Sequence, residues 1–199
     1  MQQRTAVFEQ QRARMRAEGY REINCVISVL KANVMAFLTA GPIAIVCLVL
    51  YGMVRGILLG FERSWEPLVF FVLFLALVPV HELLHGLTWS LFCKDGWSGI
   101  NFGMMGKSLT PYCTCREPLR FGHYLLGCLM PLLVLGVGFF LAALLVGSPL
   151  LAYLGVVNIL AAGGDITISF LALRHRKGWF LDHPSACGFL VFEKTDGGV

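Results

Sequence analysis

Long stretches without charged residues constrain this chain more than any other feature. No Asp, Glu, Lys or Arg occurs from Phe121 to Gly164 or from Val34 to Met53. Between Pro67 and Cys93 the only charged residue is Glu82. A helix that crosses a bilayer needs about 20 mostly apolar residues. The charged fraction of the whole chain is 14%, against about a quarter in soluble domains. The sequence therefore predicts an integral membrane protein.

Four membrane-spanning helices are expected, at about residues 33–54, 67–93, 122–146 and 149–173. The last two belong to one apolar run, which Gly147-Ser148-Pro149 divides because this tripeptide breaks helices. The predicted fold class is an all-α membrane protein with four transmembrane helices and a small cytoplasmic β-hairpin or sheet. The predicted parts are listed in chain order: a basic lead-in helix along the membrane surface (1–30), a membrane-embedded domain (31–178) and a tail (179–199).

The distribution of Lys and Arg predicts the orientation. They are concentrated in the first 31 residues, in the loop 94–121 and after the fourth span, whereas only Arg55 and Arg63 lie on the opposite side. The basic residues after the fourth span are Arg174, Arg176, Lys177 and Lys194. With four spans the three basic segments share one side, which the positive-inside rule assigns to the cytoplasm. We expect a multi-pass protein of the cell membrane with both termini cytoplasmic. The formal net charge of +4 then reflects topology, and no nucleic-acid partner is expected.

The loop 94–121 carries a strand pattern. Apolar residues alternate with small or polar ones from Ile100 to Met104, Gly106 suits a turn, and a second apolar run starts at Leu109. This pattern predicts a β-hairpin. Residues 188–194 of the tail are also strand-like and could pair with the hairpin. An exposed strand edge could receive an extended peptide, although a hairpin that only covers the end of the bundle is an equal alternative.

The segment "HELLHG" places three ionisable residues inside an apolar helix. His81 and His85 are four residues apart, so they lie on one helix face and can reach one tetrahedral metal ion. Glu82 can hold a metal-bound water and take its proton. An unpaired ionisable group in a spanning helix costs on the order of 3 kcal/mol, which disfavours chance occurrences. We therefore expect Zn²⁺ as the cofactor, with Glu82 as the catalytic base.

A catalytic zinc site needs a third protein ligand, and Asp165 is the candidate. His85 lies nine residues before Lys94, and Asp165 lies nine residues before Arg174. At 1.5 Å per residue both groups sit about 13 Å from the cytoplasmic face. Two costly groups at matched depth can satisfy each other through a metal. The alternative is a buried carboxylate that bonds to the backbone or to a stray histidine, and glutamates outside the apolar runs are weaker candidates.

Other small and polar residues fit the same site. Gly86, Gly163 and Gly164 lack side-chain bulk and should let the second and fourth helices approach closely. Asn158 lies seven residues before Asp165, on nearly the same helix face. It could contact the substrate backbone or an oxyanion, or it could be an ordinary hydrogen-bonding group between helices.

These motifs resemble a known family. "HELLHG" together with "NILAAGGD" resembles the site-2 protease class of intramembrane zinc metalloproteases. With "TPYCTCREPL", "MPLLVLG" and "DHPSACGFLVFE" added, residues 75–193 are similar to the small prokaryotic family labelled putative zincin peptidase. The resemblance implies zinc ligands and a catalytic base at the positions already named, listed here as His81, His85 and Asp165 with Glu82. It also puts Asn158 in the place of the asparagine that precedes the ligand aspartate in site-2 proteases.

The chain departs from the site-2 protease pattern in several respects, among them the residues around the ligand aspartate and the absence of prolines between Asn158 and Asp165. In those proteases glycine usually follows the ligand aspartate, whereas here glycines precede Asp165 and Ile166 follows it. The zinc assignment survives these differences, but details of substrate gating do not transfer.

The expected activity is that of a site-2 protease-like zinc metalloendopeptidase acting on membrane-spanning or juxtamembrane proteins or peptides. Its other partner is the lipid bilayer. The main alternative is a non-catalytic metal-binding membrane scaffold, against which Glu82 argues because a scaffold needs no base. An ion pathway built from His and Asp is a third possibility, and the lack of an internal repeat gives it little support.

Overall fold

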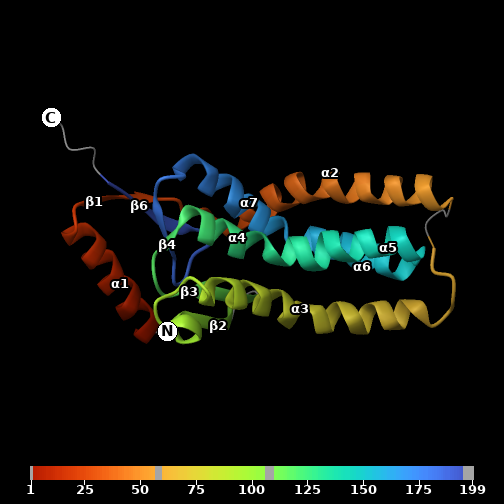
Figure 1. The fold of residues 1–199 in the computed structure, drawn as a ribbon, viewed down its shortest axis with the longest axis horizontal. Helices are drawn as coiled ribbons and strands as arrows, with labels where there is room; N and C mark the ends of the chain where they lie inside the picture. The colour runs from red at the N-terminus through yellow and green to blue at the C-terminus, as the bar shows by residue number, and fades with distance from the viewer. Residues whose placement is uncertain (1, 57–59, 106–109, 195–199) are drawn as a thin grey trace.

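A computed structural model describes residues 2–56, 60–105 and 110–194 of the chain (Figure 1). Its helices form an elongated bundle, and a small antiparallel sheet lies at one end of that bundle. The predicted combination of a mostly helical chain with a small sheet is therefore confirmed.

Three helical segments are long and apolar enough to cross a membrane, and a bent helix pair raises that number to four if the pair forms one span. The single segments are α2 (Val29–Arg55), α3 (Glu66–Ser90) and residues 121–146, which comprise α4 (Phe121–Pro131), a π-helical segment η2 (Leu132–Gly138) and α5 (Phe139–Val146). The bent pair consists of α6 (Pro149–Ala161) and of α7 (Gly163–Ala172), which the 3₁₀ turn η3 (Leu173–His175) continues. Another 3₁₀ turn, η1 (Gly96–Gly99), follows α3. The pair bends by 44°. The last three segments begin within one residue of the predicted starts, whereas α2 begins four residues earlier than predicted.

Helix α2 shows why these segments suit lipid. The Ser28 side chain caps its N-terminus by accepting the backbone N–H of Lys31, and Gly56 ends it in the left-handed conformation at φ 65°. Along its outer face large apolar side chains are exposed, among them Phe37 at 74% and Leu38 at 70%. Such a continuous apolar face is compatible with a surrounding bilayer.

Both ends of the described chain contribute to a four-stranded antiparallel sheet with the order β1-β6-β5-β4. Its strands are β1 (Tyr20–Asn24), β4 (Leu119–Arg120), β5 (Trp179–Asp182) and β6 (Phe189–Lys194). Alternate residues of β6 face opposite sides. Phe189 and Val191 pack in the cluster that reaches the helix bundle, whereas Leu190 and Phe192 pack against α1 (Gln2–Ala17).

The lead-in is partly helical, as expected, but it also supplies a strand that was not predicted. Phe8 and Met15 of α1 are buried against the outer face of the sheet. The apolar side chains of α1 therefore serve the protein core, so the expectation of a helix lying along the membrane surface gains no support from them.

The predicted hairpin is confirmed. Strands β2 (Ile100–Met105) and β3 (Thr110–Cys115) pair antiparallel, with Phe102 opposite Cys113. The turn predicted at Gly106, and the start of the second run at Leu109, lie outside the described residues. The predicted pairing of the tail strand with this hairpin is wrong, because β1 and β5 occupy both edges of β6. Strand β5 precedes β6 directly, and such consecutive strands commonly pair.

The role predicted for the glycines is also wrong. A Cβ on Gly163 would lie 2.8 Å from the carbonyl oxygen of Ala36 in α2, and one on Gly86 would lie 2.4 Å from the ring of Phe102 in β2. A Cβ on Gly164 would meet nothing within 4 Å. These glycines thus let α7 approach α2 and let α3 approach the hairpin. Helix α7 packs mainly on α2 and α4 rather than on α3.

Candidate metal centre

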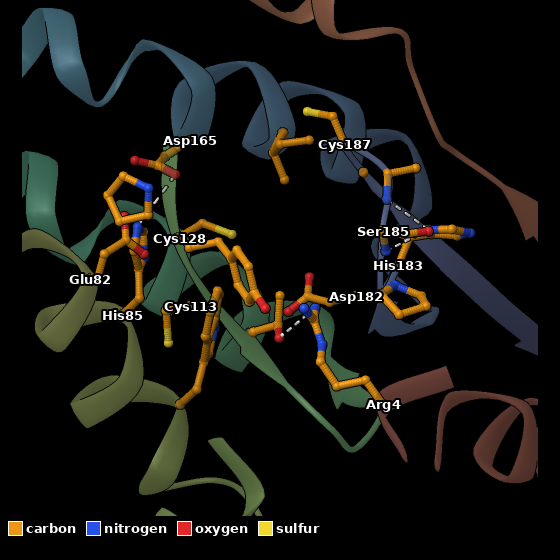
Figure 2. A pocket seen from close by; sticks show the side chains of 18 of the residues that line it. Arg4, Glu82, His85, Cys113, Cys128, Asp165, Asp182, His183, Ser185 and Cys187 are labelled. Atoms are coloured by element: carbon orange, nitrogen blue, oxygen red, sulfur yellow. Dashed lines mark hydrogen bonds and ion pairs between the residues drawn. The ribbon is translucent and has the colours of Figure 1, made fainter. Parts of the chain in front are cut away.

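The three predicted ligand residues meet at one point between helices α3 and α7. One ligand atom each from His81, His85 and Asp165 lies within 4.8 Å of the other two. His81 Nε2 is 3.1 Å from Asp165 Oδ2, and His85 Nε2 is 3.4 Å from Asp165 Oδ1. Figure 2 shows the Asp165 carboxylate directed toward this cluster, with His85 and Glu82 beside it.

The separations fit a metal ion. Tetrahedral zinc with ligand distances of about 2.0–2.2 Å holds its ligand atoms about 3.3–3.6 Å apart. The two contacts of Asp165 with the histidines, at 3.1 and 3.4 Å, are close to that spacing. Two imidazoles and one carboxylate form a donor set that suits zinc and leaves a fourth position open. Within the described ranges this is the one group of its kind.

The hydrogen bonding of His85 determines which ring nitrogen faces the cluster. Its Nδ1 lies 2.8 Å from the carbonyl oxygen of Gly127, and a carbonyl only accepts, so Nδ1 carries the proton. In the neutral ring Nε2 is then an acceptor, yet it faces the Asp165 carboxylate, which is also an acceptor. Two acceptors facing each other need a cation between them, and either a metal ion or a proton on Nε2 can supply it. A backbone carbonyl behind the ring is the usual way to orient a metal-binding histidine.

A column of stacked rings supports His85 from behind. The His85 ring stacks on Trp89 with 5.3 Å between ring centres, Trp89 stacks on Tyr124, and Tyr124 stacks on Phe180 of β5. The indole N–H of Trp89 also donates to the Tyr124 carbonyl oxygen at 3.2 Å. Since Trp89, Tyr124 and Phe180 are at most 4% exposed, the column connects the cluster rigidly to the sheet.

The break between α6 and α7 positions Asp165. Helix α6 ends at Ala161, and the backbone N–H of Ala162 bonds to the Asn158 carbonyl oxygen at 3.0 Å. Helix α7 begins at Gly163, which places Asp165 in its first turn. The positive end of a helix dipole favours a carboxylate at this position.

Glu82 lies in a cavity of about 950 Å³ that also contains His85 and Asp165 in its walls. The backbone N–H of Cys113, in β3, hydrogen-bonds to the Glu82 carboxylate. The hairpin therefore borders the cavity and holds Glu82 at the end where the cluster lies. The remaining walls come from α1, α4, α7, β5, the first residue of α2 and the segment 183–188 between β5 and β6.

A second carboxylate lines the same cavity, at Asp182 (Figure 2). Its Oδ1 accepts the hydroxyl of Tyr124 at 2.8 Å, and its Oδ2 accepts the backbone N–H of Cys115 at 3.0 Å. Burial raises the pKa of Asp182 to about 6 in spite of these hydrogen bonds, which act in the opposite direction. Asp182 thus joins β5, α4 and the outer edge of β3.

Two buried thiols anchor the other end of the hairpin. The Sγ atoms of Cys93 and Cys115 are 2.6 Å apart. The hydrogen bond between Cys115 and Cys93, together with burial, keeps the pKa of Cys115 far above its usual range. Burial does the same to Cys113. Neutral thiols are poor nucleophiles, and all three cysteines pack in the hydrophobic cluster between α3, the hairpin and the sheet.

The side chain of Asn158 makes its hydrogen bond within α6 and not with the cluster. It is 3% exposed, and its side-chain amide donates to the Leu154 carbonyl oxygen within α6 at 2.8 Å. It is not among the described residues that line the cavity. The weaker ligand candidates also have other partners, since Glu117 accepts the backbone N–H groups of Lys94 and Asp95.

Three residues near the cluster were not found by sequence reasoning. The carbonyl of Gly127 has no side-chain signal, because its role depends on where α4 lies. Asp182 closes the apolar run "WFLD", an unusual place for an acid, and this was a usable signal. Arg4 lines the cavity only because α1 folds back over the sheet, which local sequence does not indicate.

The apolar helices and the cluster of two histidines and a carboxylate beside a glutamate define a helical, membrane-compatible protein with a metallopeptidase type of centre. Residues 74–180 match the model of the family described as putative zincin peptidase, and the chain belongs to this family. The resemblance noted in the sequence is thereby confirmed at the level of the family. Searches of the curated proteins and of the solved structures gave no match. Family membership implies zinc, and the cluster can hold it.

Proposed function

We propose that this protein is a membrane-embedded zinc metallopeptidase, similar to site-2 proteases, that hydrolyses peptide bonds of membrane-spanning or juxtamembrane segments. The observation that carries the proposal is the convergence of His81, His85 and Asp165 from two helices, with Glu82 beside them in one cavity. Membership of a peptidase family supports the same reaction class.

The residues have separate roles in the proposed reaction. His81, His85 and Asp165 would hold the zinc ion, which supplies an activated water at neutral pH and polarises the scissile carbonyl. Glu82 accepts the proton of the attacking water on a carboxylate oxygen and then donates it to the leaving amine. The amide of Cys113 keeps the Glu82 carboxylate directed toward the cavity during both transfers.

The position of the cavity favours a substrate segment that extends out of the bilayer. The cavity lies where the apolar helices end and the sheet begins, between β3 and the segment 183–188. Its lining combines apolar side chains with backbone edges, which suits an extended peptide. A helical substrate would therefore have to unwind before its peptide bond reaches Glu82.

The location and orientation belong to this proposal. We place the protein in the cell membrane as a multi-pass protein with both termini in the cytoplasm. Strands β1 and β6 pair with each other, so the segments before the first span and after the last lie together at one end. This supports an even number of crossings, in which α6 and α7 form one bent span.

The test compares purified, zinc-loaded full-length protein in lipid with its Glu82→Gln variant. General acid–base groups contribute about 10²–10⁴-fold, so hydrolysis of a cleavable peptide should fall by at least about 100-fold in the variant while zinc stays bound. Glu18→Gln is the matched control, because Glu18 lies in the lead-in and pairs with Arg14. Equal hydrolysis by Glu82→Gln, or no hydrolysis by fully zinc-loaded protein, would contradict the proposal. The second result would favour a non-catalytic scaffold.

A further inference from the structure

The cavity of the metal centre has a single cationic side chain of the Lys or Arg type in its described lining, and it comes from the opposite end of the chain. This is Arg4 of α1 (Figure 2). Its guanidinium lies over the ring of Tyr112, 4.3 Å from the ring centre, and donates to Thr114 Oγ1 at 3.4 Å. Both contacts are on β3, so Arg4 lies against the strand that borders the cavity.

The pairing of Arg4 differs from that of the other arginines of the lead-in. Each of the others has a glutamate within 4.0 Å: Arg12 and Arg16 with Glu22, Arg14 with Glu18, and Arg21 with Glu193. Among the described residues no carboxylate lies that close to Arg4. The charge of Arg4 acts electrostatically on Asp182 in the same cavity, but the two residues form no ion pair within 4.0 Å. The hydrogen bonds of the Asp182 carboxylate go instead to the Tyr124 hydroxyl and the Cys115 amide.

The geometry of the guanidinium limits what it can bind. A guanidinium has five N–H donors in its plane and cannot lose its charge. The Tyr112 ring covers one face and the long contact with Thr114 occupies one edge, so other in-plane donors remain for a ligand. The ligand that fits such donors best is a planar anion that accepts two parallel hydrogen bonds, which in a peptide is a carboxylate.

The location of Arg4 relative to Glu82 determines how far from the cleaved bond a substrate carboxylate must lie. Tyr112 and Thr114 are the immediate neighbours of Cys113, whose amide holds Glu82. An extended peptide beside β3 rises about 3.3 Å per residue, so Arg4 can reach groups within about three residues of the bond next to Glu82.

We propose that Arg4 binds a substrate carboxylate, either an acidic side chain within about three residues of the cleaved bond or a nearby C-terminal carboxylate. The inference rests on the proposed peptidase function and names the substrate class. It also gives α1, which lies outside the family match at 74–180, a role in substrate selection.

The test uses peptides that differ only by Glu or Gln at one position near the cleaved bond, together with a pair that ends in a free acid or an amide. Hydrogen bonds to charged groups differ from neutral ones by enough to expect at least about tenfold higher kcat/KM for the carboxylate peptide, mainly through KM. Arg4→Gln should remove this preference, Arg4→Lys should keep part of it, and the control Arg14→Gln on the same helix should keep all of it. The peptide pair that shows the effect identifies the source of the carboxylate.

Two results would overturn the inference: equal hydrolysis of every acid and amide pair by the natural protein, or an unchanged preference in Arg4→Gln. Folding of that variant is checked by thermal unfolding, since Phe8 and Met15 should still hold α1 on the sheet. If the protein hydrolyses none of the peptides, the proposed peptidase function is contradicted, but the role of Arg4 can still be tested. Binding of the same peptides to zinc-loaded Glu82→Gln protein then decides it, with about tenfold tighter binding of the carboxylate peptide expected and lost when Arg4→Gln is added.

Discussion

His81 and Asp165 lie 3.1 Å apart through Nε2 and Oδ2, although 84 positions separate them in the chain. The helices that carry them, α3 and α7, have few other contacts with each other, since α7 packs mainly on α2 and α4. The two helices therefore meet chiefly through the side chains of the cluster. A metal ion in that cluster would join two elements that packing alone holds only indirectly.

The first prediction concerns metal binding. His81→Ala and Asp165→Ala should each purify with less than about a tenth of the zinc bound by the natural protein, because a zinc site with two protein ligands is incomplete. Glu82→Gln should retain full zinc, since Glu82 is not one of the three grouped residues. Elemental analysis of the purified proteins measures this. Full zinc content in Asp165→Ala would remove Asp165 from the ligand set.

The second prediction concerns the glycine behind His85. A Cβ at Gly127 would lie 1.9 Å from Nε1 of the buried Trp89, so Gly127→Ala must displace the indole and the ring column. Overpacking of this kind costs about 1–3 kcal/mol, and zinc affinity should fall as His85 loses its orientation. Gly122→Ala on the same helix meets nothing within 4 Å and is the control. Thermal unfolding and zinc titration would be compared, and equal behaviour of the two variants would refute the proposed support of His85.

The third prediction uses two adjacent glycines before Asp165. Gly163→Ala would place a methyl group 2.8 Å from the backbone carbonyl of Ala36, which cannot rotate away, so α7 must shift from α2. We expect a loss of about 1–3 kcal/mol in stability and weaker zinc binding, because Asp165 moves with α7. Gly164→Ala has open space and should behave as the natural protein. A larger loss in Gly164→Ala than in Gly163→Ala would show that the packing of α7 on α2 is misassigned.

The fourth prediction concerns the pH dependence of stability. The pKa of Asp182 is about 6 in the folded protein, above its ordinary value of 3.8, because of burial. Between these values the folded state binds more protons than the unfolded state, so the contribution of Asp182 to stability falls as pH rises through this window. Asp182→Asn removes that loss. Relative to the natural protein, the variant should therefore gain thermal stability from pH 5 to pH 7.

The comparison of the two melting temperatures at each pH cancels groups that both proteins share, including the metal ligands. A difference that stays constant from pH 5 to pH 7 would show that Asp182 titrates normally. A difference that moves in favour of the natural protein with rising pH would mean that its carboxylate is stabilised by the fold instead.

Much of the fold could be predicted because its signals are local. The apolar runs, the Gly147-Ser148-Pro149 break and the alternation from Ile100 to Met104 specify helices, a turn and a hairpin through neighbouring residues. The sheet could not be predicted in the same way, since β1 and β6 pair over almost the full length of the described chain. The same reason explains why the partner chosen for residues 188–194 was wrong.

The candidate site divides along the same line. The spacing of His81 and His85 on one helix, and the isolation of Asp165 in an apolar run, are readable without a structure. The support of that site is not, because Gly127 acts through its backbone and Arg4 acts through the path of α1. The packing partners of the glycines could not be predicted either. A glycine in a helix suggests a close approach of another element, but the sequence does not indicate which element that is.

The central place of β6 in the sheet has a consequence for the order in which the molecule can be built. This strand lies between β1, which precedes the first apolar helix, and β5, which follows the last one. The sheet can therefore form only after the intervening helices have folded. Phe180 in β5, on which the stacked rings behind His85 rest, is then fixed by its neighbours in the sheet. During synthesis, the cavity beside the metal centre would therefore remain unfinished until residues 189–194 had emerged.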